Sequence, residues 1–225
     1  MFIYVVLPKI YNVDVRSYMS NYWQEFIDST HESQRLDYVW RFSTIPISVP
    51  ENVSTHSYWV ILYSAMIHNM HNPNDTETLC ACVIAAMLHD YTEHRVGDFV
   101  RPFKYRTEAL KLAIDEAENL IKNEFSIPVK NMFSTSDRLT SKSPEYVKSI
   151  VKAADFMSLY TFMIREFKRG NNEIVPFFER MIVDLDAMAK SNENVKFITG
   201  GKDFEPDEFY TRLVINASKC LYARS

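Results

Sequence analysis

Glycine is scarce in this sequence, since only 4 of its 225 residues are glycine. All-β sandwiches and barrels need many tight turns, in which glycine adopts backbone conformations that other residues resist. The shortage therefore argues against those folds and favours helices. Hydrophobic residues make up 47% of the chain, which is enough for a sizeable core without cross-links.

Cysteine is also rare: the chain contains 3 cysteines, an odd number that cannot all pair with one another in disulfides. Cys80 and Cys82 form a C-x-C pair inside a predicted helix, which is typical of a reducing compartment rather than of a disulfide framework. We therefore expect a cytoplasmic protein. The opening segment MFIYVVLP is too short to cross a membrane and lacks the basic start of a signal peptide. We expect it to form a short extended arm, and we expect no membrane partner.

A strong charge of either sign is missing as well. The formal net charge is −4, and the lysines and arginines are not bunched along the chain. Binding to a nucleic-acid polymer needs a basic patch or stripe. The sequence therefore predicts no such partner.

Apolar residues recur at helical intervals over most of the chain, which predicts an all-α fold with a single domain over residues 1–225. Prolines, glycines and capping residues mark the ends of the helices. We expect helices to begin near Asp14, to follow Ser54 and Asp75 as N-caps, and to cover residues 107–125, 144–170, 176–190 and 205–222. Residues 126–143 are polar and are expected to be irregular.

Ionisable residues end one of the most apolar predicted helices, CACVIAAMLHDYTE. His89, Asp90 and, one turn later, Glu93 are costly to bury unless something pairs with them. His56 lies near the start of the preceding predicted helix, and Asp155 lies among apolar residues in a long later one. Two imidazoles and two carboxylates on packed helices can meet at one point, and this ligand mixture suits a divalent transition metal.

Each of these residues has an ordinary alternative explanation when it is taken alone. A histidine in the first turn of a helix, such as His56, is usually a cap or a surface residue. His68 and His71 lie about fifteen residues further along the same predicted helix, over 20 Å away at about 1.5 Å per residue, and are expected at the surface. Only the joint pattern of His56, His89, Asp90 and Asp155 favours a metal site.

That joint pattern resembles the HD-domain metal-dependent phosphohydrolases, and within them the YfbR-like 5′-deoxynucleotidases. The matching segments are NVSTHS (52–57), LHDYTEHRVGDFVRPFKY (88–105), VKAAD (151–155) and REFKRGNNE (165–173), with Arg41 fifteen residues before His56. The resemblance covers about residues 38–175. It implies a single HD-domain helical bundle that acts on a deoxynucleotide. Related enzymes are often dimers, so we expect a homodimer.

The resemblance also implies roles for individual residues. His56, His89, Asp90 and Asp155 fall on the metal-ligand positions, and Glu93 falls on the catalytic carboxylate position. The implied cofactor is one divalent metal, Co, Mn, Fe or Zn, with Mg as a further option.

The substrate positions follow from the same resemblance. Arg41 falls on a phosphate-binding position and Phe42 on that of an aromatic residue, commonly tryptophan, that helps to position the phosphate. Asp98 and Lys104 also lie in substrate-side segments. Arg101 stands where a small hydroxyl residue is expected, and its charge could reach a β- or γ-phosphate.

A second departure concerns Thr55, which replaces a glutamate that often precedes the first histidine ligand. Its loss is expected to weaken the support of His56. Three functions remain open at this point. The first is a phosphohydrolase of deoxynucleoside 5′-monophosphates, the second is a deoxynucleoside triphosphate phosphohydrolase, and the third is an inactive nucleotide-binding module.

Overall fold

A computed structural model of the protein describes residues 21–104, 106–177, 180–181, 190 and 192. Helices dominate this part of the chain, and its only β-pairing is an isolated bridge between Trp40 and Asn52. The elements are α2 (Asn21–Ser33), η1 (Gln34–Tyr38), α3 (Val53–His71), α4 (Thr76–Leu88), α5 (Glu93–Val96), α6 (Arg101–Lys104), α7 (Glu108–Glu124), α8 (Ile127–Thr140), α9 (Pro144–Lys168) and η2 (Asn172–Ile174). The predicted all-α class is confirmed. The expected N-terminal arm, the helix start at Asp14 and the helix over 205–222 lie outside the described residues.

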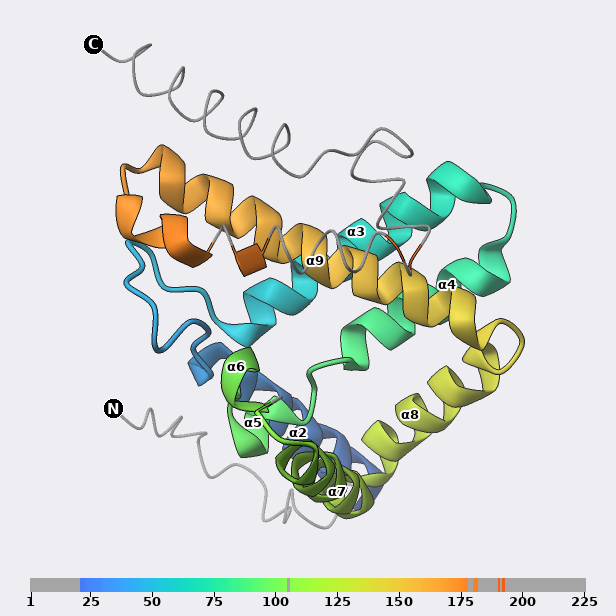
Figure 1. Ribbon diagram of the computed structural model, residues 1–225. Coiled ribbons are helices and arrows are strands. Elements are labelled where there is room, and N and C mark those ends of the chain that lie inside the picture. Colours follow the sequence, from blue (N-terminus) through green and yellow to red (C-terminus); the bar gives the residue numbers. More distant parts are fainter. Residues whose placement is uncertain (1–20, 105, 178–179, 182–189, 191, 193–225) are drawn as a thin grey trace, which may run out of the picture.

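The main core lies between α3, α4 and α9. The long helix α9 runs beside α3, and both contact α4 (Figure 1). Apolar residues three, four or seven positions apart put one face of each helix into this core. Its fully or nearly fully buried members include Val60, Ile67, Ala81, Cys82, Ala86, Ile150, Ala154 and Phe162. These helices also carry the histidines and aspartates of the predicted site.

A second apolar cluster joins the remaining helices to this core. It consists of Leu36, Val53, Leu88, Tyr91, Phe125 and Val129. Because α4 contributes Leu88 to this cluster and Ala86 to the main core, the two clusters share a helix. In Figure 1, α2 and α7 lie at the end of the view opposite α9. Within the described residues, no helix combines the length and the apolar character that crossing a membrane requires.

Several predicted helix ends are confirmed. The side chain of Asp75 accepts a hydrogen bond from the Thr78 amide and caps α4. Thr107 caps α7 in the same way. Gly170 follows α9 with a φ of +87°, a conformation that glycine adopts without strain. The prediction of Ser54 as the cap of α3 is wrong: Asn52 takes that position and accepts from the Thr55 amide.

The prediction of an irregular segment over 126–143 is also wrong, because residues 127–140 form α8. Pro128 lies in the first turn, where its missing N–H costs nothing. Val129 and Ser136 are buried seven residues apart, so one narrow face of the helix packs against its neighbours. Packing of this face stabilises a helix whose other positions are too polar to predict it.

His68 was expected at the surface, and this expectation is wrong as well. Its side chain is fully buried, and its two ring nitrogens contact the Tyr146 hydroxyl and the Asp75 carbonyl. The ring thus joins α3 to α9 and to the start of α4. His71, three residues later, is exposed as expected.

Candidate active site

Three helices bring the four predicted ligands to one point. His56 lies in the first turn of α3, His89 and Asp90 directly follow α4, and Asp155 lies in the middle of α9. His56 Nε2 is 3.3 Å from His89 Nε2, 3.3 Å from an Asp90 oxygen and 3.4 Å from an Asp155 oxygen. His89 Nε2 is 2.9 Å from the same Asp90 oxygen. The predicted convergence of these four side chains is therefore present.

The local structure around the His-Asp doublet differs from the expectation in one respect. Helix α4 ends at Leu88, and His89 is its C-cap, so the doublet lies in a turn rather than inside the helix. Glu93 then begins the short helix α5. The turn is closed by the Tyr91 and Glu93 amides, which donate to the carbonyls of Leu88 and Asp90. His89 and Glu93 therefore belong to two helices joined by a tight turn, not to one helix face.

The donor atoms fit a divalent cation. His89 Nδ1 is 2.7 Å from the Ala86 carbonyl, which can only accept, so Nδ1 carries a proton. In the neutral ring Nε2 then presents a lone pair toward the Asp90 carboxylate and His56 Nε2. Acceptors this close repel one another unless a proton or a metal cation lies between them. Ligand atoms about 2.0–2.2 Å from one ion stand about 3–3.5 Å apart, which agrees with the separations here.

The second ring nitrogen of His56 is also held. His56 Nδ1 is 2.9 Å from the hydroxyl of Ser158, and both side chains are fully buried. Ser158 lies three residues after Asp155, on the same side of α9. The sequence predicts weaker support for His56, because Thr55 replaces a glutamate. Thr55 is exposed, and Ser158 supports the His56 ring instead. Sequence spacing alone could have indicated Ser158.

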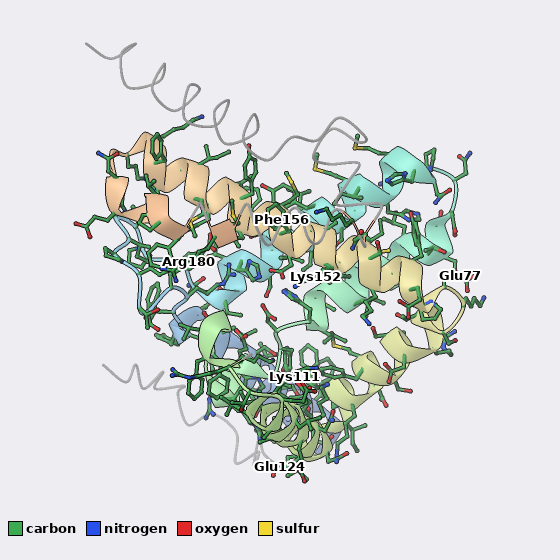
Figure 2. The ribbon with its side chains drawn as sticks, viewed as in Figure 1. Glu77, Lys111, Glu124, Lys152, Phe156 and Arg180 are labelled. Carbon is green, nitrogen blue, oxygen red and sulfur yellow. The ribbon has the colours of Figure 1, made fainter. Side chains whose placement is uncertain are left out.

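The close contacts among these side chains shift the pKa values of the two aspartates. Burial favours the neutral acid, yet His89 and His56 hold the pKa of Asp90 well below its ordinary value. The pKa of Asp155 is lowered in the same way, against burial, by His56 and by Lys152, whose Nζ lies 3.3 Å away. Figure 2 labels Lys152 and Phe156 on α9, the helix that also carries Asp155. The carboxylates thus stay ionised and available as ligands.

The pKa of His89 is shifted upward, whereas those of Asp90 and Asp155 are shifted downward. Burial alone would lower the pKa of His89, but the Asp90 and Asp155 carboxylates outweigh it and raise this pKa above its ordinary value. The side chains of His56 and His89 are 0% and 14% exposed, whereas those of Asp90 and Asp155 are 25% and 31% exposed. The cluster is therefore closed on its histidine side and open on its carboxylate side, where a ligand can approach.

Glu93 and Asp98 lie beside this cluster. Burial, followed by the negative charges of Asp90 and Asp98, raises the pKa of Glu93 to about 10. Burial likewise raises the pKa of Asp98, with the charge of Asp90 adding to the effect and Arg41 opposing it. Arg41 also acts on Glu93. Arg41, Glu93 and Asp98 therefore share one electrostatic neighbourhood with the four predicted ligands.

Arg41 and Phe42 lie in the extended segment before α3. The guanidinium carbon of Arg41 is 4.8 Å from the centroid of the Phe42 ring. Phe42 stacks on Phe162 of α9, with ring centroids 4.4 Å apart and an angle of 15° between the rings. Its φ of +59° is rare for a residue with a side chain. The stacking on Phe162 anchors the Phe42 ring on the core, and the guanidinium of Arg41 lies over that ring.

Glu51 is a residue of this region that the sequence analysis missed. Its side chain is 4% exposed, and it forms ion pairs with Arg41 and with Arg165 of α9, both at 2.9 Å. Its carbonyl also accepts from the Arg41 amide at 2.9 Å. No periodic signal marks Glu51, because it lies in a proline-containing extended segment and one partner is 114 residues away.

The remaining two predicted substrate residues lie on α6. Lys104 is ion-paired with Glu118 of α7 at 2.8 Å, which directs its ammonium group toward α7. Arg101 begins α6, but its side chain lies outside what the structure describes. Arg41, Glu93 and Asp98 therefore interact electrostatically with the cluster of four predicted ligands, and Lys104, although ion-paired with Glu118, also acts on Glu93.

Comparison with known proteins places this geometry in a family. The model of the YfbR-like 5′-deoxynucleotidases matches residues 30–200. A 5′-deoxynucleotidase of Shewanella oneidensis is 28% identical over 154 residues, which are 64% of this chain and 74% of the relative.

Two solved structures share the fold. An HD-domain phosphohydrolase from Listeria innocua is 20% identical, with a TM-score of 0.64 over 89% of this chain and 99% of the other. The HD phosphohydrolase DatZ of cyanophage S-2L, solved with dA and one catalytic Zn²⁺ ion, is 16% identical, with a TM-score of 0.53 over 84% and 96%. Because the family model matches most of its length, the chain belongs to the YfbR-like 5′-deoxynucleotidase family.

Proposed function

We propose that this protein hydrolyses deoxynucleoside 5′-monophosphates to a deoxynucleoside and inorganic phosphate. The observation that carries the proposal is the convergence of His56, His89, Asp90 and Asp155, in a chain whose family is that of the 5′-deoxynucleotidases. These four side chains would hold the divalent metal. When bound, such an ion lowers the pKa of water and offsets negative charge on a phosphoryl group.

The chain's own residues supply the remaining chemistry. Arg41 binds the phosphoryl oxygens, since a guanidinium presents several N–H donors to them. Glu93 moves the proton: its carboxyl group, kept protonated by its raised pKa, gives a proton to the leaving 5′ oxygen, and the resulting carboxylate takes one from the attacking water. Asp98 accepts a hydrogen bond from a hydroxyl of the sugar. Phe42 lies beside Arg41 and packs along the phosphate-bearing end of the substrate.

We also propose that residues 1–225 form one domain around this site, in support of which α4 contributes to both apolar clusters. The rare cysteines and the nucleotide substrate favour the cytoplasm. The absence of a bunched basic stretch in the sequence disfavours a nucleic-acid polymer as substrate. A homodimer is consistent with the family resemblance and is testable by sedimentation.

The decisive experiment compares dAMP, dATP and AMP as substrates of metal-stripped protein supplemented with Mn²⁺, Co²⁺ or Zn²⁺. We expect inorganic phosphate from dAMP only when a metal is present. Glu93→Gln should abolish turnover, and Glu116→Gln, a change at an exposed residue of α7, should preserve it. Release of tripolyphosphate from dATP without attack on dAMP would overturn the monophosphate proposal. Bound metal with no turnover of any nucleotide would indicate an inactive binding module.

A further inference from the structure

Arg41 and Arg165 donate to different oxygens of the Glu51 carboxylate. Arg41 donates to Glu51 through Nη1 alone, to the Oε1 oxygen. The other oxygen, Oε2, accepts from Arg165 Nη2. The structure gives Arg41 Nε and Nη2 no hydrogen-bond partner among the described residues. The carboxylate therefore fixes Arg41 at one nitrogen and leaves its other donors for a ligand.

Burial and further contacts hold Glu51, Arg165 and Arg41 in this arrangement. Glu51 is 5% exposed, and a buried carboxylate must be paired. Arg165 is itself held in place, because its guanidinium carbon lies 5.9 Å from the ring centroids of both Trp59 and Phe162. Arg41 is held from its main chain too, since its amide donates to the Glu51 carbonyl.

The consequence follows from the geometry of arginine–carboxylate pairs. A carboxylate with both oxygens free pairs with a guanidinium through two parallel hydrogen bonds, and this pairing would use up the donors of Arg41. Arg165 competes with Arg41 for this carboxylate, because it donates to Oε2. The Glu51 carboxylate thus orients Arg41, and Arg165 disfavours a second hydrogen bond between Glu51 and Arg41.

We propose that Glu51 and Arg165 are positioning residues that set the affinity of Arg41 for the phosphoryl group of the substrate. Neither residue touches the phosphate, and Arg165 acts only through Glu51. This inference rests on the proposed function, in which Arg41 binds phosphate. It adds two residues that the sequence motif does not mark as functional.

The test uses Glu51→Gln, Arg165→Met and the double variant, with Lys168→Met as the matched control. Lys168 is an exposed cation three residues further along α9, so this control removes the same charge from the same helix. KM and kcat are measured with dAMP, and the affinity for inorganic phosphate is measured by calorimetry on the metal-loaded protein. Thermal unfolding verifies that each variant is folded.

We expect each single variant to raise KM and weaken phosphate binding by about tenfold, the effect of losing roughly one charge-assisted hydrogen bond, with kcat changed much less. The double variant should match Glu51→Gln alone, because the proposed effect of Arg165 on Arg41 passes through Glu51. Lys168→Met should resemble the parent. Because Arg165 is partly exposed, its variant remains informative even if Glu51→Gln fails to fold.

Two results would overturn the inference. Multiplicative effects in the double variant would mean that Arg165 acts independently of Glu51, and unchanged phosphate affinity in Arg165→Met would remove it from any positioning role. The proposed function fails separately, if the parent protein turns over no deoxynucleoside monophosphate. Calorimetry with phosphate still tests the positioning role in that case, because it needs no turnover.

Discussion

His56 Nδ1 lies 2.9 Å from the hydroxyl of Ser158, and neither side chain is exposed to solvent. A metal-binding histidine generally has its second ring nitrogen held by a partner that fixes the orientation of the ring. Here that partner comes from α9, the helix that also carries Asp155. Ser158 and Asp155, which both contact His56, therefore lie within one turn of α9.

Ser158→Ala should consequently weaken metal binding. We expect a loss of about 10- to 100-fold in affinity for Mn²⁺ or Zn²⁺, because the ring of His56 is no longer held toward the ligand set. Titration of metal-stripped protein by calorimetry measures this loss. Ser136→Ala, at a buried serine of α8, serves as the control and should leave metal affinity intact. Equal affinity in Ser158→Ala and the parent would show that His56 needs no such support.

A buried carboxylate at the other end of α9 leads to a prediction about pH. Glu166 is fully buried and accepts hydrogen bonds from the Ser48 and Val49 amides and from Asn171 and Arg169. Burial favours the neutral acid, but the Ser48 amide and the other donors outweigh it and lower the pKa of Glu166 below its ordinary value of 4.5. Glu166 fixes the segment before α3 to the end of α9.

Because the pKa of Glu166 is lower in the folded state, its stabilisation is fully present above the unfolded-state pKa and is lost as pH falls through the folded-state pKa. Glu166→Gln should therefore lower the free energy of unfolding at pH 7 by about 2 kcal/mol. The gap between parent and variant should narrow from about pH 5 downward. Urea unfolding at several pH values measures the gap, with exposed Glu116→Gln as the control. A gap that stays constant down to pH 3 would contradict this assignment.

The sequence predicts those parts of the molecule that have a periodic or a chemical signature. The cap Asp75 is found from its residue type, the start of α7 near Thr107 from an apolar period, and the candidate ligands from a rare combination of ionisable residues in apolar helices. Helix α8 is missed because its apolar positions are few, and its stability depends on packing that sequence does not display.

The segment around Arg41 shows the same limit more clearly. Arg41 could be identified through the family resemblance, fifteen residues before His56, but its partners could not. Glu51 lies in an extended segment without periodicity, and Arg165 meets it only because α9 folds back across α3. Contacts between residues this far apart in the chain are set by tertiary packing. Burial of His68 is a second example, since its partner Tyr146 is 78 residues away.

The backbone at Phe42 leads to the last prediction. Its φ of +59° lies in the left-handed region, which glycine occupies without cost and other residues occupy at about 1 kcal/mol or more. Both Phe42→Ala and Phe42→Gly lose the stacking on Phe162. They differ in backbone preference, so the glycine variant should be the more stable of the two by about 1 kcal/mol.

The control is the same pair of substitutions at Lys148, an exposed position inside α9. There alanine should be the more stable by about 1 kcal/mol, because glycine is disfavoured within helices. Urea unfolding of all four variants gives the two differences. Opposite signs at positions 42 and 148 would establish that the turn before α3 stores strain at Phe42. The same sign at both positions would mean that the chain relaxes this turn once the ring is removed.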